Sequence, residues 1–325
     1  MQWADPVYLL ATKSASAVLC ALAIVLVFGE PPRQVHPVVW MGKYLQLIGL
    51  KVSRSVSAKP HPAVEFYSGM GGWIIGAALV CVVAIALTTV FSWLPYLLHV
   101  VVLGAVLKTL LSWRMLRDEV IAVEQALSES IDAGRQRVSW LVSRNVDNLD
   151  ESEIRQAAIC TLAENLNDSV VAPLFWFAVA VAGLPGAAIY RFANTADAMW
   201  GYVGERHGRD WTWAGKWAAR ADDVLSWVPA RITALLIMVS VGDYRWHRLA
   251  VNACLTPSPN SGWPMGAMAL VQNIQLGKAG VYLLNPQGRL PNSADTALAL
   301  NKFKNVIVLL MLIGACIGLW SSSHL

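Results

Sequence analysis

One stretch of the sequence, "TLAENLND", combines carboxylate, amide and hydroxyl side chains at helical spacings of three and four residues. They are Thr161, Glu164, Asn165 and Asp168. On a helix these spacings bring the side chains to one face, directly before an apolar run. Such a face can present oxygen ligands to a cation, and it is also typical of a solvated helix end before a membrane entry.

A second stretch, "YRFANTADAMWGY", places Asn194 and Asp197 three residues apart, with Arg191 one turn earlier. The amide, the carboxylate and the guanidinium together suit a polar substrate. Asn and Asp also favour helix N-caps, so a capped helix is the alternative.

A third stretch, "AARADDVLSWVPARI", has four charged side chains beside an apolar run: Arg220, Asp222, Asp223 and Arg231. Adjacent residues on a helix point about 100° apart, so we expect one aspartate to serve structure and the other to help hold magnesium. We expect Arg231 to reach phosphates. An ion pair between Arg220 and Asp223 is the alternative, although a surface pair of this kind contributes only about 0.3–0.5 kcal/mol.

The loop before "GWPMGAMALVQ" contains Pro257 and Pro259, with Asn260 or Ser261 available as a helix cap. Free backbone N–H groups at such a helix start suit an anion such as phosphate. An ordinary N-cap is equally consistent with this loop.

These four stretches point to related chemistry. Asp and Glu oxygens with few histidines suit magnesium, which prefers one or two carboxylates together with substrate phosphates. Arginines suit phosphate or carboxylate in fork geometry. We therefore expect an enzyme that handles phosphorylated substrates with a divalent metal. The sequence has no GxxxxGK[ST], GxSxG or HExxH motif, so any nucleotide would bind without a P-loop.

The composition is typical of an integral membrane protein. Of 325 residues, 56% are apolar and 14% are charged, against about a quarter charged in soluble domains. The five cysteines stand singly without a CxxC pair, and we interpret them as core residues. The net charge of +4 comes without a dense Lys/Arg tract, so we expect no nucleic-acid partner.

The apolar runs predict an all-α, polytopic helical membrane protein with five to seven apolar segments. The charge-free run 66–107 is long enough for two crossings, so it predicts a helical hairpin. Proline and glycine interrupt the run 169–190, which leaves open a simple crossing or a broken or re-entrant helix. The other runs are 14–29, 224–242 and 305–325.

Polar blocks rich in Lys and Arg separate these runs, at about 30–68, 114–168, 191–223 and 243–304. The positive-inside rule places all four on the cytoplasmic side of the cell inner membrane, with the hairpin tip at 92–95 outside. No stretch resembles a linker or a repeat, so we expect residues 1–325 to form a single multi-pass membrane domain.

Five motifs occur in the order typical of the membrane-bound cobalamin-biosynthesis family CobD/CbiB, which the sequence resembles from about residue 5 to 300. They are "GEPPRQVHPVVWMG" (29–42), "LAENLNDSVVAPLFWF" (162–177), "YRFANTADAMWGY" (190–202), "ARADDVLSWVPARITA" (219–234) and "SPNSGWPMGAMA" (258–269).

The resemblance implies an adenosylcobinamide-phosphate synthase, an ATP-dependent carbon–nitrogen ligase. Such an enzyme joins aminopropanol or aminopropanol phosphate to the free propionate carboxyl of adenosylcobyric acid. The resemblance also implies Mg²⁺, ATP as co-substrate, a corrinoid substrate, contact with membrane lipid and association with other cobalamin-assembly membrane enzymes. An unreactive carboxylate needs phosphoryl activation, which agrees with the chemistry expected above.

Carried over residue by residue, the motifs imply three sets of roles. The catalytic residues would be Glu164, Asp168, Asp197, Asp222 and Asp223. Magnesium would be held by Asp222, Asp223 and Asp168. The substrate and its phosphate would be bound by Asn165, Asn194, Arg191, Arg220, Arg231, Asn260, Ser261 and His36. For His36 we favour packing in a turn over contact with the corrin.

The sequence departs from the family pattern at Glu30, Asn145, Cys160–Thr161 and Ser169. Asn145 replaces an Asp after Arg144, and Cys160 replaces a Glu, so two carboxylates are lost. If those carboxylates held metal, this protein would be slower or inactive.

The alternative function is a non-catalytic membrane transporter or regulatory protein on the same scaffold. Acidic residues deep inside spans would favour transport. Here they lie at span ends and in polar blocks, which favours an enzyme.

Overall fold

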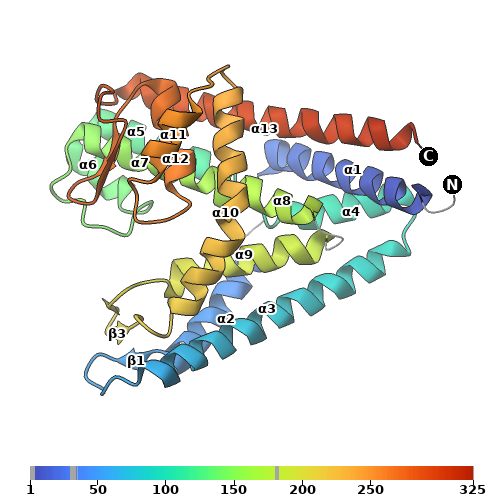
Figure 1. The fold of residues 1–325 in the computed structure, drawn as a ribbon, viewed down its shortest axis with the longest axis horizontal. Coiled ribbons are helices and arrows are strands. Elements are labelled where there is room, and N and C mark those ends of the chain that lie inside the picture. Colours follow the sequence, from blue (N-terminus) through green and yellow to red (C-terminus); the bar gives the residue numbers. More distant parts are fainter. Residues whose placement is uncertain (1–3, 30–33, 35, 180–182, 325) are drawn as a thin grey trace. The chain divides into compact units, whose positions relative to one another are not determined.

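The computed structural model describes residues 4–29, 34, 36–179 and 183–324, which form helices joined by loops and a few very short strands (Figure 1). Glu30 lies outside these residues. The chain divides into two compact units. Unit 1 comprises Met1–Leu111, Ala172–Ser226 and Gly314–Leu325, and unit 2 comprises Ser112–Val171 and Trp227–Ile313.

Unit 1 is a packed group of helices. They are α1 (Ala4–Phe28), α2 (Pro37–Val52), α3 (Pro62–Ser92), α4 (Tyr96–Lys108), α8 (Ala172–Val179), α9 (Gly183–Trp200), the first part of α10 (Lys216–Val239) and the end of α13 (Ser293–Ser322). Helix α9 packs against α2, α3 and α8, and α1 packs against α4. The side chains that α9 buries include Tyr190, Phe192 and Trp200, so α9 forms the core of this unit.

Three glycines allow α3 to approach its neighbours closely. Gly69, Gly72 and Gly76 are buried and follow the spacing of one helix face. A Cβ at Gly69 would lie 2.0 Å from the carbonyl oxygen of Ala214, and a Cβ at Gly76 would lie 2.3 Å from the ring of Phe192. Small residues at such positions let backbones pack at short range. The glycine face of α3 therefore turns inward.

A small antiparallel sheet joins the segment after α2 to the segment after α9. Its strands are β1 (Arg54–Ser55), β2 (Glu205–Arg206) and β3 (Arg209–Asp210), in the order β1-β3-β2. Arg209 donates to the carbonyls of Leu50 and Ser53 and to the Ser53 hydroxyl. A cation is favourable at the C-terminus of a helix, so Arg209 stabilises the end of α2.

Arg54 connects the same sheet to α3. It pairs with Asp210 and lies 3.3 Å from Glu65. The backbone N–H and the side chain of Thr212, together with Arg54, hold the pKa of Asp210 below its usual value. This sheet is therefore fixed by charge as well as by strand pairing.

Within the part of the chain that the structure describes, two helices are long and apolar enough to cross a membrane: α3, with 31 residues, and α13, with 30. Only 22% of the most apolar window of each is buried, whereas a core helix of a soluble protein would be mostly buried. Shorter apolar helices lie at Ala11–Val27 and Tyr96–Lys108. The run predicted as a hairpin at 66–107 forms two successive helices, α3 and α4, with three residues between them. Only α3 is long enough for a crossing, since α4 has 13 residues.

The run at 169–190 forms a broken helix, as one of the two alternatives predicted. A π-helix, η2 (Asn167–Val171), is followed by α8, which has eight residues, and α9 starts at Gly183. The helical part of the apolar run before α9, residues 169–179, spans about 16 Å, which is too short to cross a membrane. The run predicted at 224–242 forms the last part of α10, with Pro229 inside the helix.

Unit 2 carries most of the polar helices. They are α5 (Arg114–Glu129), α6 (Ile131–Val138), α7 (Glu151–Leu166), η2, the rest of α10, α11 (Trp246–Ala253), α12 (Gly262–Gln272) and the start of α13, with the strands β4 (Leu276–Lys278) and β5 (Tyr282–Leu284). Helix α7 contacts α5, α6, α12 and β4, and its buried side chains make it the centre of the unit. Most of the described residues are helical, as predicted, and both units also contain strands of two or three residues.

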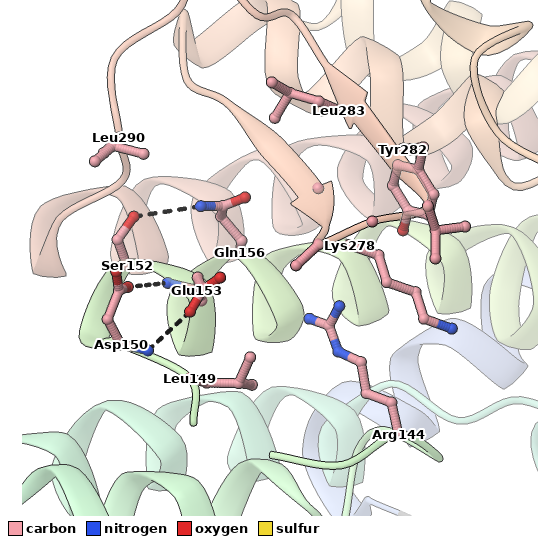
Figure 2. Close-up of a pocket in the computed structure, with 14 residues that line it drawn as sticks. Arg144, Leu149, Asp150, Ser152, Glu153, Gln156, Lys278, Tyr282, Leu283 and Leu290 are labelled. Carbon is pink, nitrogen blue, oxygen red and sulfur yellow. Dashed lines mark hydrogen bonds between the residues drawn. The ribbon is translucent and has the colours of Figure 1, made fainter. Parts of the chain in front are cut away.

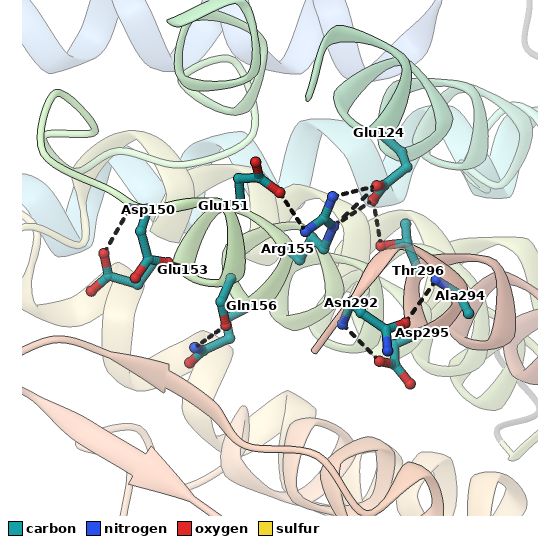
Figure 3. Close-up of polar contacts among 11 residues, drawn as sticks. Glu124, Asp150, Glu151, Glu153, Arg155, Gln156, Asn292, Ala294, Asp295 and Thr296 are labelled. Atoms are coloured by element: carbon teal, nitrogen blue, oxygen red, sulfur yellow. Dashed lines mark hydrogen bonds and ion pairs between the residues drawn. The ribbon is translucent and has the colours of Figure 1, made fainter. Parts of the chain in front are cut away.

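Charged side chains fix α7 against α5 and the start of α13 (Figure 3). Arg155 donates to both oxygens of Glu124 at 2.9 to 3.2 Å and to Glu151 at 3.1 Å. Glu124 also accepts a hydrogen bond of 2.9 Å from the Thr296 hydroxyl. The side chain of Arg155 is only 13% exposed. This pair is therefore shielded from water more than an ordinary surface pair.

A second pair orders the first turn of α13. The Asp295 carboxylate accepts two hydrogen bonds from Arg289, at 2.6 and 2.7 Å, and a third from the Asn292 N–H at 2.8 Å. A carboxylate is also favourable at the N-terminus of a helix. Asp295 is almost fully buried, so the turn is stable only while these hydrogen bonds compensate for the loss of water around the carboxylate.

We predict that Arg155→Ala lowers the stability of the fold by about 1–3 kcal/mol, because it leaves Glu124 half-buried without its partner. The measurement is the shift in the thermal unfolding midpoint of the purified protein. Arg117→Ala is the matched control, because Arg117 pairs only with the exposed Asp118. Equal midpoints for the two variants would show that the Glu124 pair contributes no more than a surface pair.

Candidate functional site

Helix α7 begins and ends with special geometry. At its start, the Asp150 side chain accepts from the Glu153 N–H and the Glu153 side chain accepts from the Asp150 N–H, a capping box. At its end, the π-helix η2 interrupts the α-helical hydrogen bonding from Asn167 onward. π-helical turns occur frequently at functional sites. The α-helical spacing that placed Asp168 on the face of Glu164 therefore holds only as far as Leu166.

The π-helix arranges a chain of hydrogen bonds among polar groups of unit 2. The Asn167 amide donates to Asp168 Oδ1 at 2.8 Å, and Asn167 Oδ1 lies 3.1 Å from the Thr233 hydroxyl. Ser169 donates to Asn165 Oδ1 at 3.3 Å. Asn167, Ser169 and Thr233 are buried, so α10 and η2 share a satisfied polar core beside the half-buried Asp168.

Two residues predicted from different motifs, Arg231 and Asn260, contact each other directly. Arg231 donates to Asn260 Oδ1 at 2.9 Å and to the Pro259 carbonyl at 3.2 Å. Its guanidinium lies over the rings of Trp227 and Trp263, at 4.3 and 4.7 Å from their centroids. Arg231 thus joins α10 to the loop before α12.

The cap of α12 differs from the expectation. Ser261 is the N-cap residue, but its side chain makes no capping hydrogen bond. The hydroxyl of Ser258 instead accepts from the N–H groups of Asn260 and Ser261, each at 3.2 Å. The backbone donors of Asn260 and Ser261 are therefore already engaged within the loop.

The other predicted residues lie in unit 1. Arg191 donates to Asn194 Oδ1 at 3.4 Å, one turn along α9. The Asp197 carboxylate packs against Gly201, where a Cβ would lie 2.0 Å from Asp197 Oδ1. Only a glycine at 201 leaves room for this side chain. His36 is the N-cap residue of α2, with its ring nitrogen accepting from the Val38 N–H at 3.3 Å.

Arg220, Asp222 and Asp223 lie on the first turns of α10. Arg220 is exposed, whereas both aspartates are half-buried. Burial raises the pKa of Asp223, so its carboxylate is more costly to ionise than one in water. Across the described residues, no group of three or more His, Cys, Asp or Glu side chains is arranged to hold a metal ion.

A cavity of about 530 Å³ lies in unit 2 between the start of α7 and the β4–β5 hairpin (Figure 2). Its lining residues are Arg144, Leu149, Asp150, Ser152, Glu153, Gln156, Gly277, Lys278, Ala279, Gly280, Val281, Tyr282, Leu283 and Leu290. A cavity of this size suits a small molecule.

The cavity residue Tyr282 belongs to a group of neighbouring titratable side chains. Burial raises the pKa of the Cys160 thiol to about 12, while a hydrogen bond with Tyr282 acts in the opposite direction. Burial also raises the pKa of Tyr282. Glu164 and Arg144 act electrostatically on both groups, so all four side chains are neighbours. The predicted residue Glu164 therefore lies near two residues that line the cavity.

The sequence did not mark most of these cavity residues. Lys278 and Tyr282 stand in a short hairpin whose pairing depends on tertiary contacts, and Arg144 was noted only as the neighbour of Asn145. One signal was present: Asp150 and Glu153 stand three residues apart before an apolar helix, which is the pattern of a capping box. That pattern predicts a helix start but no ligand.

Comparisons with known proteins agree over almost the whole chain. The family model described as CobD/Cbib protein matches residues 18–310. A protein of Thermococcus kodakarensis named "Probable cobalamin biosynthesis protein CobD" is 37% identical over 92% of this chain and 96% of its own. The "Cobalamin biosynthesis protein CobD" of Brucella suis is 38% identical over 83% of this chain and 82% of its own. No solved structure matches the chain.

We predict that Thr233→Val destabilises the fold by about 1–3 kcal/mol, because it leaves the buried side-chain oxygen Oδ1 of Asn167 without its hydroxyl partner. Thermal unfolding of the purified protein measures the effect. Thr89→Val is the control, since the Thr89 hydroxyl bonds only to its own exposed helix. If Thr233→Val unfolds at the same temperature as Thr89→Val, the bond between α10 and η2 carries no stability.

Proposed function

Because the chain belongs to the CobD/CbiB protein family of cobalamin biosynthesis, we propose that it is an ATP-dependent carbon–nitrogen ligase that acts on a corrinoid. The reaction joins aminopropanol, or aminopropanol phosphate, to the free propionate carboxyl of adenosylcobyric acid and gives adenosylcobinamide or its phosphate. The observation that carries this proposal is the family match from residue 18 to 310, which includes the motif residues around η2 and α10.

The chemistry sets the requirements of the site. A carboxylate does not react with an amine until one of its oxygens has been made into a leaving group, so ATP first transfers a phosphoryl group to the propionate and releases ADP. The amine then attacks the acyl carbon, the bond to the phosphate oxygen breaks, and phosphate and a proton are released. The site must therefore neutralise phosphate charge and accept a proton.

The polar residues described above suit these tasks. Arg191 and Arg220 are guanidinium groups that can bind phosphate or carboxylate in fork geometry. Glu164, Asp168 and Asp197 are half-buried carboxylates that can accept a proton or orient the amine. We assign Arg231 and Asn260 to substrate binding as a connected pair.

The half-buried carboxylates at the start of α10 fit magnesium. They offer oxygen ligands, and a bound cation would offset the burial that raises the pKa of Asp223. At least one of Asp222 and Asp223 would hold the ion. Magnesium supplies neutralisation of the phosphate charge when it is bound.

We propose that the protein works in the cell inner membrane as a multi-pass protein with its polar segments in the cytoplasm. The exposed apolar surface of α3 and α13 supports a lipid environment for these two helices. The concentration of Lys and Arg in the polar blocks supports a cytoplasmic position for them. ATP and the corrinoid would meet these segments on that side.

The direct test is an assay with the purified protein, adenosylcobyric acid, ATP, magnesium and either aminopropanol or its phosphate. The expected product contains one new amide bond and is identified by its mass. Glu164→Gln and Asp168→Asn should each lower the rate by about 10²–10⁴-fold, the usual contribution of a proton-transfer group. Glu129→Gln, which changes an exposed carboxylate of the same unit, should retain full activity. No amide product from the unmodified protein would refute the ligase assignment.

A second test concerns the adjacent aspartates. Asp222→Asn and Asp223→Asn keep size and hydrogen bonding but remove the charge that magnesium requires. We expect one of the two variants to abolish amide formation although the protein accumulates and inserts into the membrane normally. Excess magnesium should restore part of its activity. Full activity in both variants would leave the pair as a solvated helix start.

A further inference from the structure

Two cations, Arg144 and Lys278, line the cavity of unit 2. Arg144 and Lys278 form no ion pair and no side-chain hydrogen bond among the described residues, and Arg144 Nε is buried there without a hydrogen-bond partner. A buried donor without an acceptor is costly. An anion bound in the cavity would satisfy this group. Phosphate and carboxylate are the anions that a guanidinium recognises best.

The opposite side of the cavity is acidic. Figure 2 shows Asp150 and Glu153 on one side and Arg144 with Lys278 on the other. In the capping box, Oδ1 of Asp150 accepts at 2.8 Å and Oε2 of Glu153 accepts at 2.9 Å. Each carboxylate therefore keeps its second oxygen for another donor.

From this division of charge we infer that the cavity binds a short zwitterion, with a phosphate held by Arg144 and Lys278 and an ammonium group held by Asp150 and Glu153. The lining contains two cations and two carboxylates, so its formal charge is balanced. A ligand with separated charges of both signs matches this lining. A nucleoside triphosphate does not, because its several negative charges would meet the two carboxylates without an ammonium group to offset them.

The inference rests on the proposed function in one respect, because the phosphorylated amine of the proposed ligation is a molecule of this class. It assigns binding roles to Arg144, Lys278, Asp150 and Glu153, none of which the motifs marked. Asp150 is exposed, so the ammonium end of the ligand lies where an acyl group can reach it from solvent. The phosphate end lies against the half-buried Arg144.

Binding can be measured without the ligase reaction. The full-length purified protein is titrated by calorimetry with O-phosphoethanolamine, and inorganic phosphate, ethanolamine and ATP serve as comparison ligands. We expect O-phosphoethanolamine to bind at least about tenfold more tightly than phosphate or ethanolamine, because each of these makes only one set of the charged hydrogen bonds. ATP should not compete with it.

Charge variants locate the site. Arg144→Ala and Lys278→Ala should each raise the dissociation constant of O-phosphoethanolamine by about tenfold to a hundredfold. Arg117→Ala removes the same charge from an exposed position of the same unit and should change nothing. Lys278 is exposed, so its replacement leaves the packing of the core intact.

The acidic end has its own matched variant. Asp150→Asn combined with Glu153→Gln preserves both capping hydrogen bonds, because Asn and Gln also serve in a capping box. The double variant should lose affinity for O-phosphoethanolamine while binding inorganic phosphate at least as tightly as before.

Three results would overturn the inference: no binding of O-phosphoethanolamine, unchanged binding in all the variants, or competition by ATP that Lys278→Ala removes. The last result would assign the cavity to a nucleotide. The proposed function fails separately. Binding as expected without any corrinoid amide product would refute the ligase and leave the zwitterion site, whereas amide formation that is insensitive to these variants would refute only the site.

Discussion

The ion pair between Arg155 and Glu124 is the contact on which the arrangement of unit 2 depends. It fixes the second turn of α7 against α5, and through Thr296 it extends to the start of α13. The cavity lies at the beginning of α7, Cys160 and Glu164 follow, and η2 continues from its end. Because one helix carries all these groups, a shift of α7 would move the cavity and the polar core together.

Much of the helical organisation could be predicted from the sequence, because long charge-free runs and their interruptions are local signals. The two successive helices in the run 66–107 and the broken run at 169–190 are of this kind. The π-helix was not predictable, since it depends on a single additional residue in a turn and on hydrogen bonds to distant groups such as Thr233. The strands of two or three residues are likewise too short for a pattern of alternation.

In the candidate site, too, the local sequence predicted some residues, whereas their contacts depend on the fold. Polar motifs marked residues such as Glu164 and Arg231, but they gave no information on which of them meet. The structure joins Arg231 to Asn260 between two tryptophan rings, and it gives the loop before α12 a serine cap at 258. Arg144 and Lys278 were missed because the sequence does not show which charged side chains form an ion pair. That depends on which residues the fold brings together.

In the membrane location proposed above, the length of α3 has a consequence for the surrounding lipid. With 31 residues at about 1.5 Å each, α3 is about 46 Å long, well beyond the roughly 30 Å of a bilayer's hydrocarbon core. Its first turn cannot sink into the hydrocarbon, because Glu65 is paired there with Arg54. The excess length must be taken up by tilting or by projection into the headgroup region. Such a helix is longer than the hydrocarbon core it would cross, which is a hydrophobic mismatch. The tilt of α3, and with it the packing of unit 1, would therefore depend on the thickness of the membrane.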